Sequence, residues 1–290
     1  MWSFDYSSIS SIKSLLSEYG FTPTKERGQN FLISNSAREK IAISITAGLS
    51  PTDEVWEIGP GLGSITSLIL KSGCKLKCFE LDYGFISILK EAFKDEPNFT
   101  LVEGDALETV FKEKALPSVI AGNLPYNVGT VLIAKMLENQ VLPERMVFTL
   151  QKEVAERLSF KNKNDRSSIT TLASLSYDAK IVATLRPGDF WPSPKIDSSV
   201  VVLTKSDSKL YDKVKDSYSD FVKINRAVYA LRRKTIKNNL NGIFADKTSV
   251  VLNELKLKEN LRSDDLTIEN IVDLSLKYTE LKRKGEINET

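Results

Sequence analysis

The sequence predicts an α/β fold in which a mostly parallel sheet carries helices on both faces, followed by a smaller all-helical C-terminal domain. Two observations lead to this prediction. Short apolar runs alternate with amphipathic segments over the first part of the chain, which is typical of strand-helix-strand units. From about residue 207 the helical periodicity continues without strand-like runs. We therefore divide the chain into two domains, residues 1–206 and 207–290.

The expected strands are short apolar runs bounded by turn residues, and helix-period segments separate them. The strand candidates are 55–58, 76–81, 99–102, 119–121 and 146–150, and the helix candidates between them are 64–72, 83–94 and 129–138. Two further runs, 180–185 and 198–204, flank a Pro-rich turn and are expected to close the sheet as an antiparallel hairpin. Ser36 and Glu39 have the spacing of a capping box, which predicts the start of a helix ahead of the first strand.

The C-terminal domain is expected to contain only helices. The helical pattern covers 211–239, recurs around Leu252 and covers 268–278. We treat 221–239 as one helix, on which Ile224, Val228 and Leu231 form an apolar stripe.

Composition excludes several classes of chemistry. The 290 residues contain no histidine, which removes Ser-His-Asp triads, Cys-His pairs and His-based zinc helices, and we expect no metal site. The two cysteines, Cys74 and Cys78, lie beyond disulfide reach on an extended segment, as in a reducing compartment. With no export signal and no long apolar run, we expect a cytoplasmic protein without a membrane span.

The segment EIGPGLG at 57–63 is expected to join a strand to a helix. Glycines such as Gly59 and Gly61 allow a ligand close to the backbone there, and a helix N-terminus favours nucleotide-type ligands. The dinucleotide fingerprint is incomplete, because Ser64 occupies the place of its third glycine. A structural tight turn is the alternative interpretation.

Two acidic residues follow at the ends of the next strands. Glu80 is placed to accept hydrogen bonds from both hydroxyls of a ribose, and Asp105 to accept one from an adenine amine. A lone carboxylate at a strand end is more often solvated or a helix cap. The carboxyl ends of parallel strands meet at one crevice. The glycine-rich turn, Glu80 and Asp105 together therefore predict an adenosine site.

Asn123-Leu124-Pro125-Tyr126 follows the fourth strand and is the most specific signal in the chain. The exocyclic nitrogen of adenine is a poor nucleophile, since its lone pair is delocalised into the ring. The Asn123 side-chain oxygen and the Leu124 carbonyl can each accept one of its N–H groups, while Pro125 disfavours a helical conformation at Leu124. Tyr126 offers a ring on which the base stacks. An Asn-initiated turn is the alternative.

The motifs closely resemble those of the ribosomal RNA adenine dimethyltransferases, which form N6,N6-dimethyladenosine at two adjacent adenines near the 3′ end of small-subunit rRNA. The resemblance covers nearly the whole chain. The matching segments are 28–32 (GQNFL), 57–63 (EIGPGLG), 80–82 (ELD), 104–105 (GD), 122–127 (GNLPYN), 190–198 (FWPSPKIDS), 232–235 (RRKT) and 238–240 (NNL).

The resemblance implies a Rossmann-like class I methyltransferase sheet and S-adenosyl-L-methionine as methyl donor. It implies that the cofactor site is lined by Asn30, Leu32, Gly59, Gly61, Glu80, Asp105 and Asn123. Phe190 would cover the face of the target adenine opposite Tyr126, and the loop 28–32 would close over the cofactor. Trp191 and the first 20 residues depart from the usual pattern, and we expect neither to touch the proposed chemistry.

The net charge is only +2, so attraction to RNA requires a local basic face. We expect this face on the predicted helix 221–239 and next to it, formed by Arg226, Arg232, Arg233, Lys234 and Lys237. An ordinary solvated helix surface is the alternative. The expected partner is small-subunit rRNA within a pre-ribosomal particle, bound by a monomer.

Two other functions compete with this interpretation. One is methylation of large-subunit rRNA, which would use the same cofactor site; Leu124 and the long helical C-terminal part favour the small subunit. The other is a non-catalytic ribosome assembly factor on the same fold, against which the intact Asn123, Asp105 and Glu80 argue. A dinucleotide-dependent dehydrogenase would leave the Asn-Leu-Pro-Tyr segment without a role.

Overall fold

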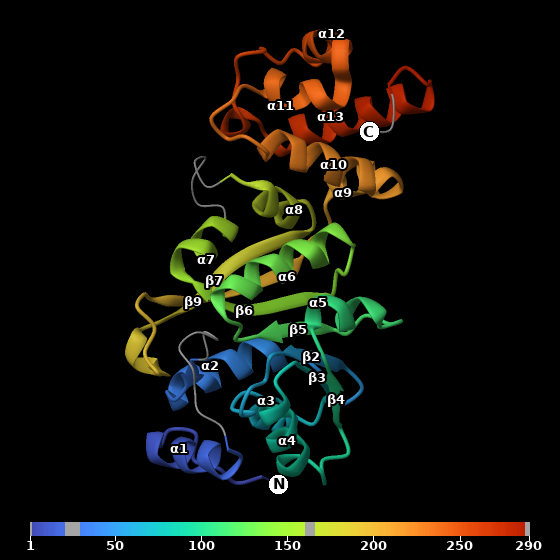
Figure 1. The fold of residues 1–290 in the computed structure, drawn as a ribbon. Coiled ribbons are helices and arrows are strands. Elements are labelled where there is room, and N and C mark those ends of the chain that lie inside the picture. Colours follow the sequence, from blue (N-terminus) through green and yellow to red (C-terminus); the bar gives the residue numbers. More distant parts are fainter. Residues whose placement is uncertain (1, 21–29, 160–165, 288–290) are drawn as a thin grey trace. The chain divides into compact units, whose positions relative to one another are not determined.

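The computed structural model describes residues 2–20, 30–159 and 166–287, without the side chains of Tyr126 and Asn127. A seven-stranded sheet with strand order β4-β3-β2-β5-β6-β9-β7 forms its centre (Figure 1). Its strands are β2 (Glu54–Ile58), β3 (Lys75–Glu80), β4 (Phe99–Glu103), β5 (Val119–Gly122), β6 (Arg145–Gln151), β7 (Tyr177–Leu185) and β9 (Ser198–Lys205). The mixed α/β fold with a helical C-terminal part is the class that the sequence predicted.

Neighbouring strands from β4 to β6 run parallel, with Val55 in register with Leu76 on one side and Val119 on the other. Strand β9 is antiparallel to β6. The chain order reverses between β2 and β5, which is where doubly wound sheets form a crevice at the carboxyl ends of their strands. The topology therefore places the ends of β2, β3, β4 and β5 around one site.

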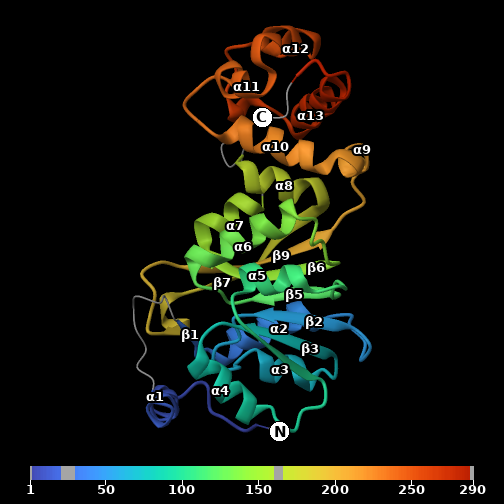
Figure 2. The same ribbon diagram turned by 45° about the vertical axis from the view of Figure 1, so that its right-hand side comes forward.

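Helices cover both faces of the sheet (Figure 2). Buried residues of α2 (Asn35–Thr46), α3 (Thr66–Lys71) and α4 (Tyr83–Ala92) form one core with the side chains of one face, including Val55, Leu76 and Val119. The opposite face carries Trp56 and Phe79, which are also fully buried. This part of the chain also contains α5 (Ala106–Thr109), α6 (Tyr126–Glu138) and α7 (Lys152–Leu158).

A short strand ahead of the sheet pairs with a short strand from the connection between β7 and β9. Strand β1 (Phe31–Leu32) is antiparallel to β8 (Phe190–Trp191), with Leu32 opposite Phe190. Helix α1 (Ile9–Glu18) packs Ile12, Leu15 and Leu16 against Leu62 and Phe85. The N-terminal segment thus packs into a hydrophobic core beside the turns after β2 and β3.

The predicted capping box at Ser36 is wrong. Helix α2 begins at Asn35, and the Ser34 hydroxyl is its cap, accepting a hydrogen bond of 3.4 Å from the Ala37 N–H. The physical reason is the β1–β8 ribbon: the carbonyl of Asp189 accepts hydrogen bonds from the backbone of Ile33 and Ser34, so the chain is extended up to Ser34 and turns into a helix directly after it.

The helices of the C-terminal part differ in length from those predicted: the pattern over 211–239 is divided among several short helices, whereas the last helix is longer than the expected 268–278. These helices are α8 (Ser168–Ser176), α9 (Lys209–Val214), α10 (Tyr218–Tyr229), α11 (Ile236–Phe244), α12 (Thr248–Glu254) and α13 (Ile268–Arg283). The single helix expected over 221–239 is wrong, because α10 ends at Tyr229. The Asn239 amide donates to the carbonyls of Val228 and Leu231, and Thr235 caps α11. Leu231 is 57% exposed and does not extend the apolar stripe.

The chain folds into two compact units. The first contains residues 1–136, 141–155 and 180–205, and the second contains 137–140, 156–179 and 206–290. The second unit therefore contains residues 206–290 together with two earlier segments, and one of these includes α8, whose Ser168 accepts hydrogen bonds from the Asn225 amide.

Gly63 allows the closest packing in the turn after β2. Its φ is +81°, and an added Cβ would lie 2.7 Å from the Phe93 ring. We predict that Gly63→Ala lowers the free energy of unfolding by about 2–4 kcal/mol, because φ strain and overpacking add. Gly73→Ala is the control, since φ is +84° there with open space around the new methyl group. Urea unfolding measures both, and equal losses would mean that the contact with Phe93 contributes nothing.

Candidate functional site

A cavity of about 920 Å³ lies at the carboxyl ends of β2, β3, β4 and β5. Its size is in the usual range for a site that holds a small molecule or cofactor. The predicted cofactor residues all contribute to its lining, namely Asn30, Leu32, Gly59, Gly61, Glu80, Asp105 and Asn123. Of the predicted catalytic residues, Leu124, Pro125 and Phe190 line it as well. The fold thus brings segments from four loops and the β1–β8 ribbon to one pocket.

The glycine-rich turn forms the floor of the pocket beside β2. Gly59 and Gly61 have φ of +64° and +57°, a region that residues with a side chain rarely adopt. The Gly59 N–H donates to the carbonyl of Phe79 (2.9 Å), which fixes the turn on the neighbouring strand. The conformation of this turn therefore depends on glycine. The same glycines allowed the turn to be predicted from the sequence.

Glu80 is fixed more firmly than its place at a strand end predicts. It is 7% exposed, and its carboxylate accepts backbone N–H groups of Gly61 (3.1 Å), Leu81 and Asp82 (2.9 Å each). Burial raises the pKa of this carboxyl, while the three hydrogen bonds act in the opposite direction. The side chain joins the turn after β2 to the turn after β3 and places a carboxyl group in the pocket wall.

Glu57 is a second buried carboxyl of the pocket, and the sequence pattern assigned it no role. Its Oε2 accepts hydrogen bonds from the Thr66 hydroxyl (2.6 Å) and the Cys78 thiol (3.6 Å). Burial raises its pKa to about 7. Cys78 and Cys74 are both buried free thiols, in agreement with the prediction that they form no disulfide.

Asp105 serves as a helix cap. Its Oδ1 accepts the Leu107 N–H (2.8 Å) at the start of α5, while the exposed side chain lines the pocket. The capping interpretation is thus correct for one oxygen. The predicted hydrogen bond from an adenine amine concerns the other oxygen and stays a prediction.

The segment after β5 reaches the pocket as predicted. Asn123 is half-buried, and Leu124 is buried against Gly59 and Gly122. An added Cβ on Gly122 would lie 2.8 Å from the carbonyl oxygen of Ile58, so the close approach of β5 to β2 requires glycine there. The carbonyl of Pro125 accepts the first N–H groups of α6. The ring of Tyr126 lies outside the described residues, and so do Gly28 and Gln29 of the predicted closing loop.

Residues of the N-terminal segment also reach the pocket, where the sequence pattern assigned them no role. Tyr6 and Ile12 both line the pocket. Trp191, the other departure, stacks on the pocket residue Phe31 with ring centroids 6.1 Å apart. The apolar spacing of Ile12, Leu15 and Leu16 was the available signal for a packed helix here.

The model of the family described as ribosomal RNA adenine dimethylase matches residues 20–280 of this chain. The chain belongs to this family. It is 41% identical to the ribosomal RNA small subunit methyltransferase A of Treponema denticola, over 93% of this chain and 94% of that protein. The protein of that name from Borreliella burgdorferi is 35% identical, with the same coverage.

Solved structures agree with the fold. A dimethyladenosine transferase from Plasmodium falciparum superimposes with a TM-score of 0.69 at 24% identity, covering 88% of this chain and 98% of that one. The 23S rRNA methyltransferase ErmE gives 0.59 at 21% identity, covering 86% and 100%. The sheet and its flanking helices are thus those of class I methyltransferases.

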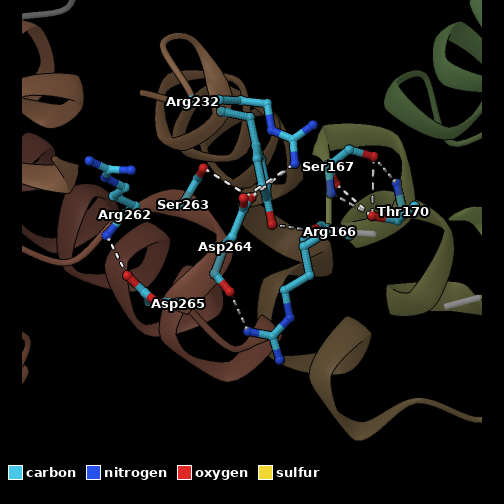
Figure 3. A network of polar contacts seen from close by, with 10 residues as sticks. Arg166, Ser167, Thr170, Arg232, Arg262, Ser263, Asp264 and Asp265 are labelled. Atoms are coloured by element: carbon cyan, nitrogen blue, oxygen red, sulfur yellow. Dashed lines mark hydrogen bonds and ion pairs between the residues drawn. The ribbon is translucent and has the colours of Figure 1, made fainter. Parts of the chain in front are cut away.

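In this member of the family, ion pairs neutralise part of the predicted basic face. Arg226 donates to Glu138 (2.8 Å), Lys237 to Glu259 (2.7 Å) and Arg232 to Asp264 (3.2 Å). Figure 3 shows that Arg232 and Arg166 both contact Asp264. Arg232 donates to its carboxylate, and Arg166 donates to its backbone carbonyl (3.3 Å). Arg233 and Lys234, in the turn between α10 and α11, are exposed and form no ion pair within the described ranges.

The described residues contain no helix that is long and apolar enough to cross a membrane. They also contain no cluster of three or more Cys, Asp or Glu side chains arranged to hold a metal ion.

The raised pKa of Glu57 predicts how stability varies with pH. The unfolded chain ionises this carboxyl near pH 4.5 and the folded chain near pH 7, so its contribution is present below pH 4.5 and is lost as the pH rises through 7. Between pH 5 and 8 the unfolding free energy of the wild type should therefore fall by a Glu57 contribution on the order of 2 kcal/mol. We predict that this contribution is absent in Glu57→Gln. Urea titrations measure it, with Glu103→Gln as an exposed control. A parallel pH dependence of wild type and Glu57→Gln would contradict the assignment.

Proposed function

We propose that this chain transfers methyl groups from S-adenosyl-L-methionine to N6 of two adjacent adenines near the 3′ end of small-subunit rRNA, giving N6,N6-dimethyladenosine. The observation that carries the proposal is the position of Asn123, Leu124 and Pro125 at the end of β5, on the pocket that Glu80 also lines. The relatives named ribosomal RNA small subunit methyltransferase A support the choice of substrate.

The residues present fit S-adenosyl-L-methionine. The lining of the pocket includes the carboxyls of Glu57, Glu80, Asp82 and Asp105, and no lysine or arginine belongs to the lining drawn from the described chain. Such a wall favours a ligand with a positive centre. When bound, the cofactor supplies an activated methyl group on a sulfonium. Glu80 would bind the ribose hydroxyls and Asp105 the adenine amine, while the positive-φ turn at Gly59 and Gly61 admits the ligand close to the backbone.

The protein's contribution to the reaction is to position the adenine. Asn123 Oδ1 and the Leu124 carbonyl would each accept one N–H of the amine, which draws the nitrogen toward tetrahedral geometry and turns its lone pair toward the donor. Phe190, which is buried and held opposite Leu32 by the β1–β8 ribbon, would cover one face of the base, and Tyr126 the other. No general base is required before the transfer, because the amine loses its proton after it has become cationic.

We further propose that the substrate is rRNA within a pre-ribosomal particle, that the protein acts as a monomer, and that it does so in the cytoplasm. Arg233 and Lys234 are the strongest candidates for phosphate contacts, since they are exposed and carry no ion pair within the described ranges. Methylation of large-subunit rRNA and a non-catalytic assembly role remain the competing functions. Labelled S-adenosyl-L-methionine, supplied with small-subunit and large-subunit particles, tests all three through the identity of the labelled nucleoside.

Asn123→Ala should lower single-turnover methylation by about 100- to 1,000-fold at saturating cofactor, because the lost acceptor acts mainly in the transition state. Affinity for the particles, measured by filter binding, should change little, since RNA binding is spread over many phosphate contacts. The exposed Asn253→Ala is the matched control. Near-normal turnover would reject the role of Asn123, and an equal loss of turnover and RNA affinity would indicate a structural role.

Replacing Arg233 and Lys234 together by alanine should weaken RNA binding and flatten its dependence on salt. Each lost phosphate contact removes about 0.7 from the slope of log K against log salt for single strands, and about 0.9 for B-form duplexes. Arg226→Ala is the control, because this exposed cation is already paired with Glu138. Binding measured at several salt concentrations should separate the two variants, whereas identical slopes would mean that the turn at 233–234 does not contact phosphate.

A further inference from the structure

The N-terminal segment contributes a buried tyrosine to the lining of the pocket. Tyr6 is 4% exposed and lines the cavity together with Ile12. Its hydroxyl is buried and has no hydrogen-bond partner in the described part of the chain. A buried hydroxyl without a partner destabilises a protein and is uncommon, so it calls for an explanation in terms of a ligand.

The surroundings of this hydroxyl are rich in donors. Trp2 and Ser67 provide its nearest polar groups, and neither forms a hydrogen bond of good geometry with it. The Trp2 indole N–H is itself buried and has no partner in the described ranges. Burial raises the pKa of Tyr6 above its ordinary value, so the side chain is a neutral hydroxyl that can donate. Within the described chain, the Tyr6 hydroxyl is therefore an unpaired donor on a residue of the pocket lining, whereas Trp2 does not belong to that lining.

The charged groups near Tyr6, Arg38 and Glu57, indicate which class of ligand the site can bind. The Arg38 guanidinium lies over the Tyr6 ring, 5.0 Å from its centroid, and its Nε and Nη1 are buried without partners in the described chain. Glu57 is close enough to act electrostatically on the Tyr6 hydroxyl. A purely anionic ligand would meet Glu57, whereas a group that carries both a carboxylate and an ammonium suits a site flanked by a cation and a carboxyl.

We propose that the Tyr6 hydroxyl donates a hydrogen bond to the carboxylate of the amino-acid end of the methyl donor, with Arg38 as a fixed positive charge behind the ring. The inference rests on the proposed cofactor, whose ribose is assigned to Glu80. Tyr6 is then a cofactor-binding residue supplied by the N-terminal arm, and it selects ligands that retain the α-amino acid group over those that contain only the nucleoside.

Calorimetric titration of the full-length protein with three ligands tests this. S-adenosyl-L-methionine and S-adenosylhomocysteine contain the amino-acid end, and 5′-methylthioadenosine keeps the nucleoside and sulfur but lacks it. Tyr6→Phe should weaken binding of the first two by about 10-fold or more, as for a lost hydrogen bond to a charged group, and leave the third unchanged. Tyr19→Phe, which makes the same chemical change in the same aromatic cluster but outside the pocket lining, should bind all three like wild type.

The outcomes are distinct. If Tyr6→Phe binds all three ligands like wild type, this inference is overturned while the proposed cofactor stands. If it loses affinity equally for all three, the hydroxyl maintains the shape of the pocket, and the assignment to the carboxylate is overturned. If the wild-type protein binds none of them, the proposed function and this inference are both rejected. Thermal melting of both variants establishes that they are folded.

Discussion

The Glu80 carboxylate accepts hydrogen bonds from backbone N–H groups of two loops, the turn after β2 and the turn after β3. Its carbonyl also accepts the N–H of Gly104 (2.8 Å), which follows β4. One residue thus holds three consecutive loops at the edge of the sheet. The pocket depends on this arrangement, because the three loops carry the positive-φ turn, the cap of α4 and Asp105.

Two buried carboxyl groups give the pocket its character. Glu57 and Glu80 are both buried, and the described lining contains no basic side chain to balance them. Burial without a cation is unfavourable for a carboxylate, and Glu57 accordingly has a pKa raised to about 7. A cationic ligand would lower this cost. The buried carboxyls that reduce the stability of the protein therefore also favour binding of a sulfonium.

Much of this architecture could be predicted from the sequence, and the failures have physical causes. Strand ends marked by Gly59, Glu80 and Asn123 were found because a glycine turn or a polar residue directly follows an apolar run. The break between α10 and α11 was missed because it depends on Asn239, whose side chain binds carbonyls eight and eleven residues earlier. Tyr6 was missed for a related reason: its role depends on tertiary contacts with Arg38 and the pocket, and no local pattern encodes them.

The pairing of β1 with β8 also determines when the site can exist during synthesis. Residue 31 finds its partner at residue 191, and the first compact unit is completed only by residues 180–205. A nascent chain that has not yet extended beyond Trp191 lacks the strand that positions Phe190, and contacts between such distant segments form slowly. Most of the chain must therefore be synthesised before the pocket can form. A product that terminates before β8 would contain the glycine turn and Glu80 but would lack Phe190.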